Sequence, residues 1–557
     1  MRRVTSAAIV LLGRLLRLLR VGKLVHFFRS SRAPSPRTST SLTDLPSDVL
    51  YLIFALLSDR SRDRTWYGGF CDGFYLIPVS ETCRYMRQQA KPWIFREVYN
   101  WNREEGDVWP KSLWPFIVQV HLRDCSIYST VPITLSSDLF KTLPLLLSLS
   151  RVILDLRIAI PPDKLVALSL LPQLRSLELR QARLDGPSLS LPQASFASLE
   201  RLVISIWRIS QVLRIRDVDQ QRECVNVAVL LRAASGSLTT LSISGDLVSR
   251  DFLSIKWPCL RNLTITEHTP APYLSVPDII SQMTAVRRLS VLYTADKSRD
   301  VGERRPPFTL GVRGGDIVNA SPYLREVTLS NLQPDDPIFQ QLPSRLEALH
   351  IVAAEDLYLP VATASRNKKW APLAAATALT VLKNIFRLTD ITELTLTLDH
   401  FATPALVHRI ATALPSLQVL ELGHAEYPQG SLERRDVRDH ALLEPLTRLT
   451  SLRRLRISLD FYERIGRYHD RQRAAQIRAA RWFLIHLPAL QDIAFSCDNW
   501  FSWRSYYPLE RVSWATYSRA VLFLEAVPTP PPTPSGSRVD FRSRAPSPVE
   551  TRSTILS

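Results

Sequence analysis

A seven-residue apolar pattern, L-x-x-L-x-L-x, occurs thirteen times between residues 117 and 496. Its alternating last part is typical of a short strand with one buried face. The first apolar residues of the thirteen copies are Ile117, Leu149, Leu174, Leu199, Leu238, Leu260, Val286, Leu324, Leu346, Ile391, Leu417, Leu452 and Leu490. Successive copies lie 22 to 45 residues apart, so each fits one strand plus a returning connection. The chain therefore reads as an irregular array of repeats.

Several copies follow an amphipathic stretch that ends in proline, as in ALVHRIATALPSLQVLEL at residues 405–422. Proline cannot extend the preceding helix, so each unit reads as helix, break and short strand. A strand this short is stable only when its neighbours stack on it. The pattern resembles the leucine-rich-repeat superfamily in its irregular forms. The resemblance implies an α/β solenoid with a parallel concave sheet and outer helices. The asparagine that commonly follows the strand is mostly missing here, which leaves the number and register of the repeats open.

A second motif lies before the repeats: LPSDVLYLIFALL at residues 45–57, followed by VSETCRYMRQQAKPWIFREV at residues 79–98. Pro46 suits the first turn of a helix, and apolar residues follow at helical spacing on one wide face. A second apolar stripe runs through Val79, Cys83 and Met86. Two or three short helices cannot bury both stripes, so part of this surface should contact a partner.

These residues resemble the F-box family. The resemblance implies binding to a Skp-type adaptor, and through it to a cullin scaffold and its RING subunit. It assigns eight residues to the adaptor interface and the fold beneath it: Leu45, Pro46, Val49, Leu50, Ile53, Phe54, Val79 and Cys83. The alternative, that these are plain core positions, stays open.

The repeat array also predicts a binding surface, because side chains that flank the last buried residue of each strand point to the concave face. Six charged or ionisable candidates for substrate contact are His121, Arg123, Glu178, Arg180, Glu421 and Arg456. The other flanking positions are rich in Ser and Thr. Over the whole set, three arginines (Arg123, Arg180, Arg456) balance three acids (Asp155, Glu178, Glu421). A neutral, hydroxyl-lined surface favours a protein or peptide and argues against nucleic acid, which requires a concentration of Lys and Arg.

The net charge of +18 arises largely outside the repeats. Residues 1–41 are Arg-rich and contain no acidic residue. Their apolar runs are too short to span a bilayer. Residues 1–30 are typical of a basic amphipathic helix on a membrane surface or a mitochondrial presequence, and a disordered extension is the alternative. Residues 528–557 are rich in Pro, Ser and Arg, and we expect a disordered tail.

Catalysis is not expected, because the sequence contains no Gly-rich phosphate loop, no H-E-x-x-H and no nucleophile elbow. The six cysteines form no C-x-x-C pair, and the ten histidines lie apart. We therefore expect no metal, no cofactor, and a reducing compartment, either cytoplasm or nucleus.

Four segments are predicted: an extension at residues 1–41, an F-box at 42–100, the solenoid at 101–527 and the tail at 528–557. The predicted function is substrate recognition for an SCF-type ubiquitin ligase. The alternative is a ubiquitin-independent repeat scaffold that binds proteins, associated with membranes through its N-terminal segment.

Overall fold

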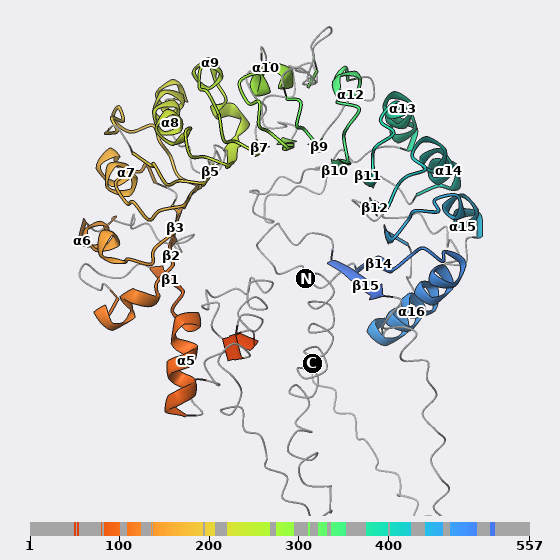
Figure 1. Ribbon diagram of the computed structural model, residues 1–557, viewed down its shortest axis with the longest axis horizontal. Coiled ribbons are helices and arrows are strands. Elements are labelled where there is room, and N and C mark those ends of the chain that lie inside the picture. Colours follow the sequence, from red (N-terminus) through yellow and green to blue (C-terminus); the bar gives the residue numbers. More distant parts are fainter. Residues whose placement is uncertain are drawn as a thin grey trace, which may run out of the picture. The chain divides into compact units, whose positions relative to one another are not determined.

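Figure 1 shows the computed structural model of the chain, which divides into two compact units, Met1–Val98 (unit 1) and Tyr99–Ser557 (unit 2). The structure describes residues 50–51, 53–54, 80, 83–100, 109–123, 135, 137–156, 158–192, 195–205, 220–267, 274–293, 310–311, 321–330, 336–352, 375–398, 402–424, 440–459, 468–497 and 513–518. The N-terminal extension and the C-terminal tail lie outside the described residues. The predicted domain boundaries stay predictions.

Unit 1 contains helix α5 (Arg84–Ile94) and the helical residues Leu50, Tyr51, Ile53 and Phe54. The Cys83 Sγ atom accepts a hydrogen bond from the Met86 amide at 3.4 Å and so caps the first turn of α5. One hydrophobic core joins these elements and consists of Leu50, Phe54, Met86, Ala90, Trp93 and Ile94.

The chain forms a fifteen-stranded sheet whose strands follow one another in sequence order, and all of it except the first two residues of β1 belongs to unit 2. The strands are β1 (Glu97–Asn100), β2 (Gln119–Arg123), β3 (Arg151–Asp155), β4 (Ser176–Arg180), β5 (Arg201–Ser205), β6 (Thr240–Ser244), β7 (Asn262–Glu267), β8 (Arg288–Tyr293), β9 (Glu326–Ser330), β10 (Ala348–Val352), β11 (Glu393–Leu398), β12 (Val419–His424), β13 (Arg454–Ile457), β14 (Asp492–Cys497) and β15 (Ser513–Ser518). Strands β2 to β14 pair in parallel, and β15 pairs antiparallel to β14.

The thirteen copies of the apolar pattern become the thirteen strands β2 to β14. Each strand begins two residues after the first apolar residue of its copy, as Ser176 follows Leu174. All thirteen first apolar residues are buried, with at most 1% of their surface exposed. The predicted parallel solenoid is confirmed, and its repeat number and register are now fixed. Unit 2 is a leucine-rich-repeat-like α/β solenoid.

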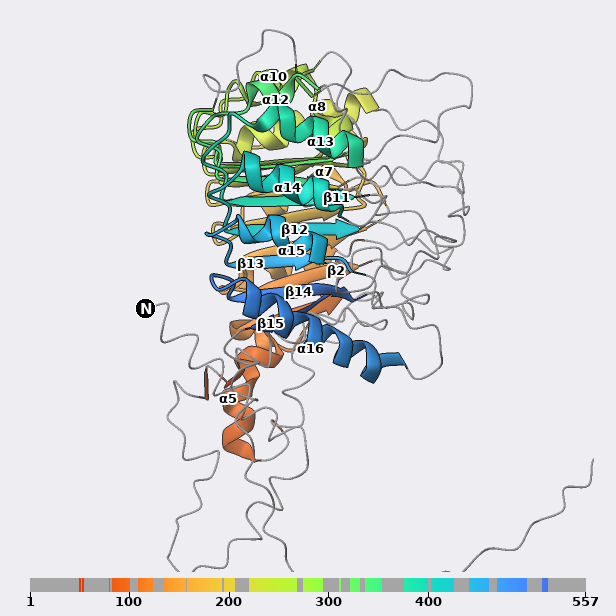
Figure 2. The ribbon, with the colours of Figure 1, turned by 90° about the vertical axis from the view of Figure 1, so that its right-hand side faces the viewer.

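Helices connect the strands and cover the outer side of the sheet (Figures 1 and 2). The α-helices of unit 2 are α6 (Ser137–Thr142), α7 (Pro162–Ser169), α8 (Gln220–Ala234), α9 (Arg250–Leu253), α10 (Val276–Ile280), α12 (Ile338–Gln341), α13 (Ala375–Ile385), α14 (Pro404–Ala413), α15 (His440–Thr447) and α16 (Tyr468–His486). Short 3₁₀ helices are η3 (Lys111–Phe116), η4 (Leu143–Leu145) and η5 (Gly245–Leu247). No described helix is long and apolar enough to cross a membrane.

Part of the long connection between β8 and β9 is packed into the solenoid. The sequence of residues 294–320, with its GERRPPF and RGGD turns, is typical of an exposed surface loop, yet Leu310 and Gly311 are buried. The Asp336 carboxylate accepts hydrogen bonds from the amides of Leu310 and Gly311 at 2.7 and 2.9 Å, and from Ile338 at 2.9 Å. Because buried amides require acceptors, this carboxylate ties the insertion to the start of α12. Residues 353–372, a second long insertion whose sequence is typical of a surface loop, lie outside the described residues.

Candidate functional site

The inner face of the sheet, opposite the helices, carries side chains in register across neighbouring strands. In β4, Leu177 and Leu179 are buried toward the helices, so Ser176, Glu178 and Arg180 point to the inner face. We call the equivalents of these three positions the first, middle and third rows. The sequence predictions covered only the middle and third rows.

The first row adds charged side chains that the sequence analysis missed. It places four arginines on the inner face against three carboxylates: Arg151, Arg201, Arg288, Arg454, Glu326, Glu393 and Asp492. These residues lie two positions before each predicted middle-row residue. Side chains two positions apart on a strand lie on the same face, so extending the prediction back by two residues would have identified them.

The six predicted contact residues fall into separate places on this face. His121 and Arg123 lie on β2, Glu178 and Arg180 on β4, Glu421 on β12 and Arg456 on β13. The structure brings Glu178 together with Arg180, and Glu421 with Arg456, whose Nη1 atom donates to Oε2 at 2.9 Å. The side chain of Arg123 lies outside the described residues.

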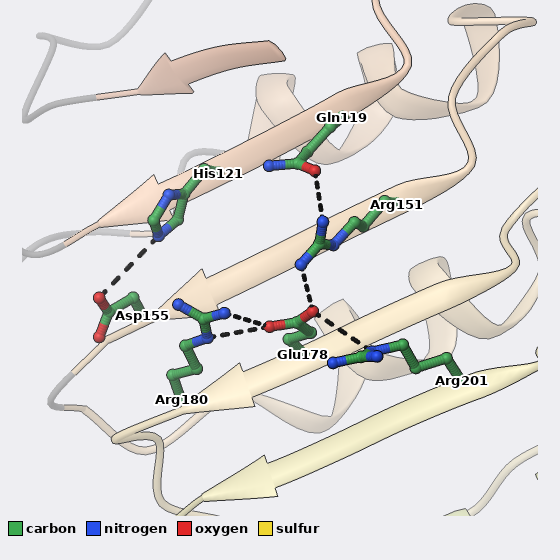
Figure 3. A network of polar contacts seen from close by, with 7 residues as sticks. All are labelled: Gln119, His121, Arg151, Asp155, Glu178, Arg180 and Arg201. Carbon is green, nitrogen blue, oxygen red and sulfur yellow. Dashed lines mark hydrogen bonds and ion pairs between the residues drawn. The ribbon is translucent and has the colours of Figure 1, made fainter. Parts of the chain in front are cut away.

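Three arginines surround Glu178, forming what we call the arginine cluster: Arg151, Glu178, Arg180 and Arg201 (Figure 3). Arg151 donates through Nη2 to Oε1 at 2.5 Å, and Arg180 donates through Nε and Nη2 to Oε2 at 2.9 and 2.5 Å. The Nε atom of Arg201 lies 3.7 Å from Oε1. The four residues come from three consecutive strands, β3 to β5.

The side chain of Glu178 is only 1% exposed, so its charge depends on these partners. Burial alone would raise the pKa of Glu178. The charges of Arg180 and Arg151, together with their hydrogen bonds, outweigh burial and hold the pKa below the ordinary value of 4.5. Glu178 is therefore a carboxylate at neutral pH and holds the guanidinium groups in place.

A polar chain borders the arginine cluster on the side of β2. Arg151 also donates through Nη1 to the Gln119 side-chain oxygen at 3.0 Å. The Nε2 atom of His121 lies 3.9 Å from Asp155 Oδ2, next to the cluster in Figure 3. His121 also packs against Tyr99, with ring centroids 5.1 Å apart.

A second charged group lies on strands β8 to β11. Arg288 Nε is 2.9 Å from Glu326 Oε2, and His350 Nε2 is 3.9 Å from Glu326 Oε1. The other ring nitrogen of His350 is hydrogen-bonded to the Thr395 hydroxyl at 2.8 Å. From β6 to β9 the middle row carries Ser242, Thr264, Ser290 and Thr328, all half-buried.

The fixed charges and hydroxyls of the inner face suit the binding of a polar ligand. Among the described residues, no group of three His, Cys, Asp or Glu side chains could hold a metal ion. The described acids on the inner face are balanced mainly by arginines, which are charged at any physiological pH. Fixed charges and hydroxyls on a rigid sheet can orient a bound polypeptide.

Four of the eight predicted adaptor-binding residues are described. Leu50 and Phe54 are 1% exposed and belong to the core of unit 1, while Ile53 and Cys83 pack against that core. Tyr51, between the two core residues, is 59% exposed. Leu45, Pro46, Val49 and Val79 lie outside the described residues.

No model of a protein family matches the sequence, and no curated protein matches it. Among the solved structures that are similar to parts of it are the following three. A chain of the Toll–Spatzle complex from Drosophila is 14% identical, with a TM-score of 0.28, over 65% of this chain and 42% of that chain. The TLR13–ssRNA13 complex is 15% identical, with a TM-score of 0.27, over 68% of this chain and 57% of that one. CroV588, described as a circular LRR protein, is 13% identical, with a TM-score of 0.23, over 63% and 54%.

The alignments thus span less than two thirds of each of these solved chains. The leucine-rich-repeat-like architecture of unit 2 follows from its own strand order, register and buried leucines.

Proposed function

We propose that this chain is the substrate-recognition subunit of an SCF-type ubiquitin ligase. The F-box binds a Skp-type adaptor, and the inner face of the solenoid binds a protein substrate. The observation that carries the ligase half is the shared core of Leu50, Phe54 and α5, since the F-box resemblance assigns Leu50, Phe54 and Cys83 to this fold. Leu50 and Phe54 then form the core that holds the interface in place, and exposed side chains next to them contact the adaptor.

Tyr51 marks that surface. It is 59% exposed, and its ring packs edge-on against Trp93 with centroids 4.7 Å apart. Tyr85, at the start of α5, is 41% exposed. Aromatic side chains held by a core yet open to solvent are enriched at protein interfaces, because they bury a large area at little entropic cost.

The inner face of unit 2 supports the substrate half of the proposal. Its rows of hydroxyls and ion-paired arginines stand on a sheet whose other face is fixed by buried leucines, so the surface is rigid before binding. Binding there holds the substrate near the charged ubiquitin-conjugating enzyme and raises its effective concentration. No residue of this chain needs to react. The compartments proposed are cytoplasm and nucleus.

Co-purification with the Skp-type adaptor tests the ligase half. The full chain, a Tyr51→Asp variant and a Tyr323→Asp variant are compared. Tyr323 lies in unit 2 and is 58% exposed, which matches Tyr51 at 59%, so the control introduces the same charge at equal exposure. We expect the intact chain and Tyr323→Asp to capture the adaptor, and Tyr51→Asp to lose at least about tenfold in affinity, as truncation of an aromatic anchor does.

Circular dichroism and thermal unfolding must show that all three proteins are folded. Leu50→Asp is unsuitable as the interface variant, because its buried charge would unfold unit 1. Loss of binding could then result from unfolding and not from a lost contact. If the folded, intact chain captures no adaptor, the ligase proposal is wrong, and the chain is a ubiquitin-independent repeat scaffold. If Tyr51→Asp binds normally, the adaptor contacts another surface of unit 1.

A further inference from the structure

The arginine cluster contains more positive charge than its one carboxylate, Glu178, neutralises. Three guanidinium groups share Glu178, and the next carboxylate, Asp155, lies beside Arg180 in the strand register and close to His121. Asp155 is 14% exposed, whereas Arg151, Arg180 and Arg201 are 34, 42 and 52% exposed. The positive charge is therefore the part of the cluster that faces solvent.

Hydrogen-bond donors in the cluster also remain available. Both oxygens of Glu178 are occupied by Arg151 and Arg180. Within the described part of the chain, Arg180 Nη1 and both terminal nitrogens of Arg201 have no hydrogen-bond partner. Guanidinium donors bind carboxylate oxygens in pairs, and donors that are already oriented lose little entropy on binding.

We infer that Arg180 and Arg201, oriented by Glu178, bind the carboxylates of an acidic peptide segment in the protein held on the inner face. This inference rests on the proposed function in one respect, that the inner face binds a polypeptide. It adds the chemical class of the segment and the place where its acidic end is recognised.

The path of the segment follows the middle row away from the cluster. Beyond Glu178 on β4 the row carries Val203, Ser242, Thr264, Ser290 and Thr328, on β5 to β9. These small side chains let a peptide backbone approach the sheet, and the four hydroxyls can donate to and accept from it. Strands lie about 4.8 Å apart, so five strand intervals span roughly 24 Å, or about seven extended residues.

The charge of the inner face sets the direction of the segment. From β9 onward, the first row presents the half-buried acids Glu326 and Glu393. Arg288 pairs with Glu326, whereas Glu393 on β11 repels carboxylates. An acidic run is therefore favoured over β3 to β5 and disfavoured over β9 to β11.

Peptide binding to the full-length protein tests the inference. The probes are fluorescein-labelled octapeptides: alternating Glu and Ser, the same with Gln in place of Glu, and the Gln peptide with one phosphoserine. Arg180→Gln/Arg201→Gln is compared with Arg261→Gln/Arg287→Gln. The second pair removes the same charge from two exposed arginines of unit 2 that have no ion-pair partner among the described residues. The single variant Arg201→Gln keeps all four hydrogen bonds between arginines and Glu178 or Gln119.

We expect the Glu peptide to bind the wild type and the Arg261/Arg287 variant equally, within about twofold. The Arg180/Arg201 variant should bind about tenfold more weakly, and Arg201→Gln about threefold, as expected for the loss of exposed charge contacts. The Gln peptide should bind poorly to all proteins. Equal losses in both double variants, or no binding of the Glu peptide, would overturn the inference. Binding of the phosphopeptide alone would replace the acidic segment by a phosphorylated one.

The adaptor co-purification is made on the same preparations, so the two proposals fail separately. Capture of the adaptor without binding of the Glu peptide would remove only the acidic segment. Binding of the Glu peptide at the cluster without capture of the adaptor would remove only the ligase.

Discussion

At the scale of the residue, Glu178 shows how a buried charge is made tolerable on an otherwise hydroxyl-rich surface. The side chain is 1% exposed, and its desolvation is offset by four hydrogen bonds or ion pairs from three arginines. The arginines in turn keep between a third and a half of their surface exposed. The carboxylate thus acts as an internal counter-ion that orients cations toward solvent.

Replacing Glu178 by Gln should lower the free energy of unfolding at pH 7 by about 2 kcal/mol. Removing one partner of a fully buried ion pair lowers stability by more than this. The loss is smaller here because the three arginines are partly exposed, so water can solvate their charges in the variant. Urea denaturation of the variant and wild type measures the difference. Glu444→Gln is the control, because Glu444 forms an exposed ion pair with Arg448 and its loss should change stability by less than about 0.5 kcal/mol.

The effect of Glu178 should also depend on pH. Its pKa in the folded protein is held below the unfolded value of 4.5, so ionisation favours folding. This contribution is present in full above pH 4.5 and is lost as the pH falls through the folded pKa. The stabilities of wild type and Glu178→Gln should therefore converge below pH 4.5, where the carboxyl becomes protonated. A difference that stays constant from pH 7 to pH 3 would contradict this account.

At the scale of the element, the strands were predictable because each one buries leucines at fixed spacing. All thirteen copies of the pattern form strands of the parallel sheet, irrespective of connection length. The strands β1 and β15 carry no copy of the pattern, and the sequence analysis missed them. Periodicity in the sequence therefore identifies the strands that bury leucines between neighbouring repeats, and it misses strands at the two ends of the sheet that do not.

The arginine cluster was only half predicted. Glu178 and Arg180 are two residues apart on one strand, whereas Arg151 lies 27 residues before Glu178 in the sequence. Their contact depends on the register between β3 and β4, which the loops and buried leucines fix together. Likewise, periodicity placed Leu50 and Phe54 on an apolar face, but the structure was needed to show that α5 covers them.

The packed segment at Gly311 provides a prediction for one connection. A β-carbon at this position would lie 2.3 Å from Ile338 N and 2.7 Å from Pro337 C, both backbone atoms at the start of α12. Because backbone cannot move aside as a side chain can, Gly311→Ala should destabilise the protein by about 2 kcal/mol. Gly236→Ala is the control, since nothing lies within 4 Å of its added carbon. Equal thermal stability of the two variants would show that the Gly311 segment is not tightly packed.

At the scale of the whole molecule, the described residues of unit 2 bury their leucines along the sheet instead of around one central core. Its strands each contact mainly the next strand in sequence order, and one continuous row of buried leucines runs through them. Stability in such an array is approximately a sum of local contributions and interfaces between neighbours. A binding face extended over many strands can therefore vary in one part while the rest of the solenoid is preserved.

A cavity made in one repeat should accordingly loosen that repeat and its neighbours more than distant ones. Leu263 in β7 is 1% exposed, and Leu263→Ala should cost about 3 kcal/mol locally. Hydrogen exchange followed by mass spectrometry should show faster exchange in β6 to β8, with β2 and β14 nearly unchanged. The adjacent Thr264→Ala, on the half-buried inner face, should leave exchange within about twofold of wild type throughout, because it opens no cavity among the buried leucines. If Leu263→Ala instead accelerated exchange equally in every strand, unit 2 would unfold as one cooperative body, and its binding surface could not vary repeat by repeat.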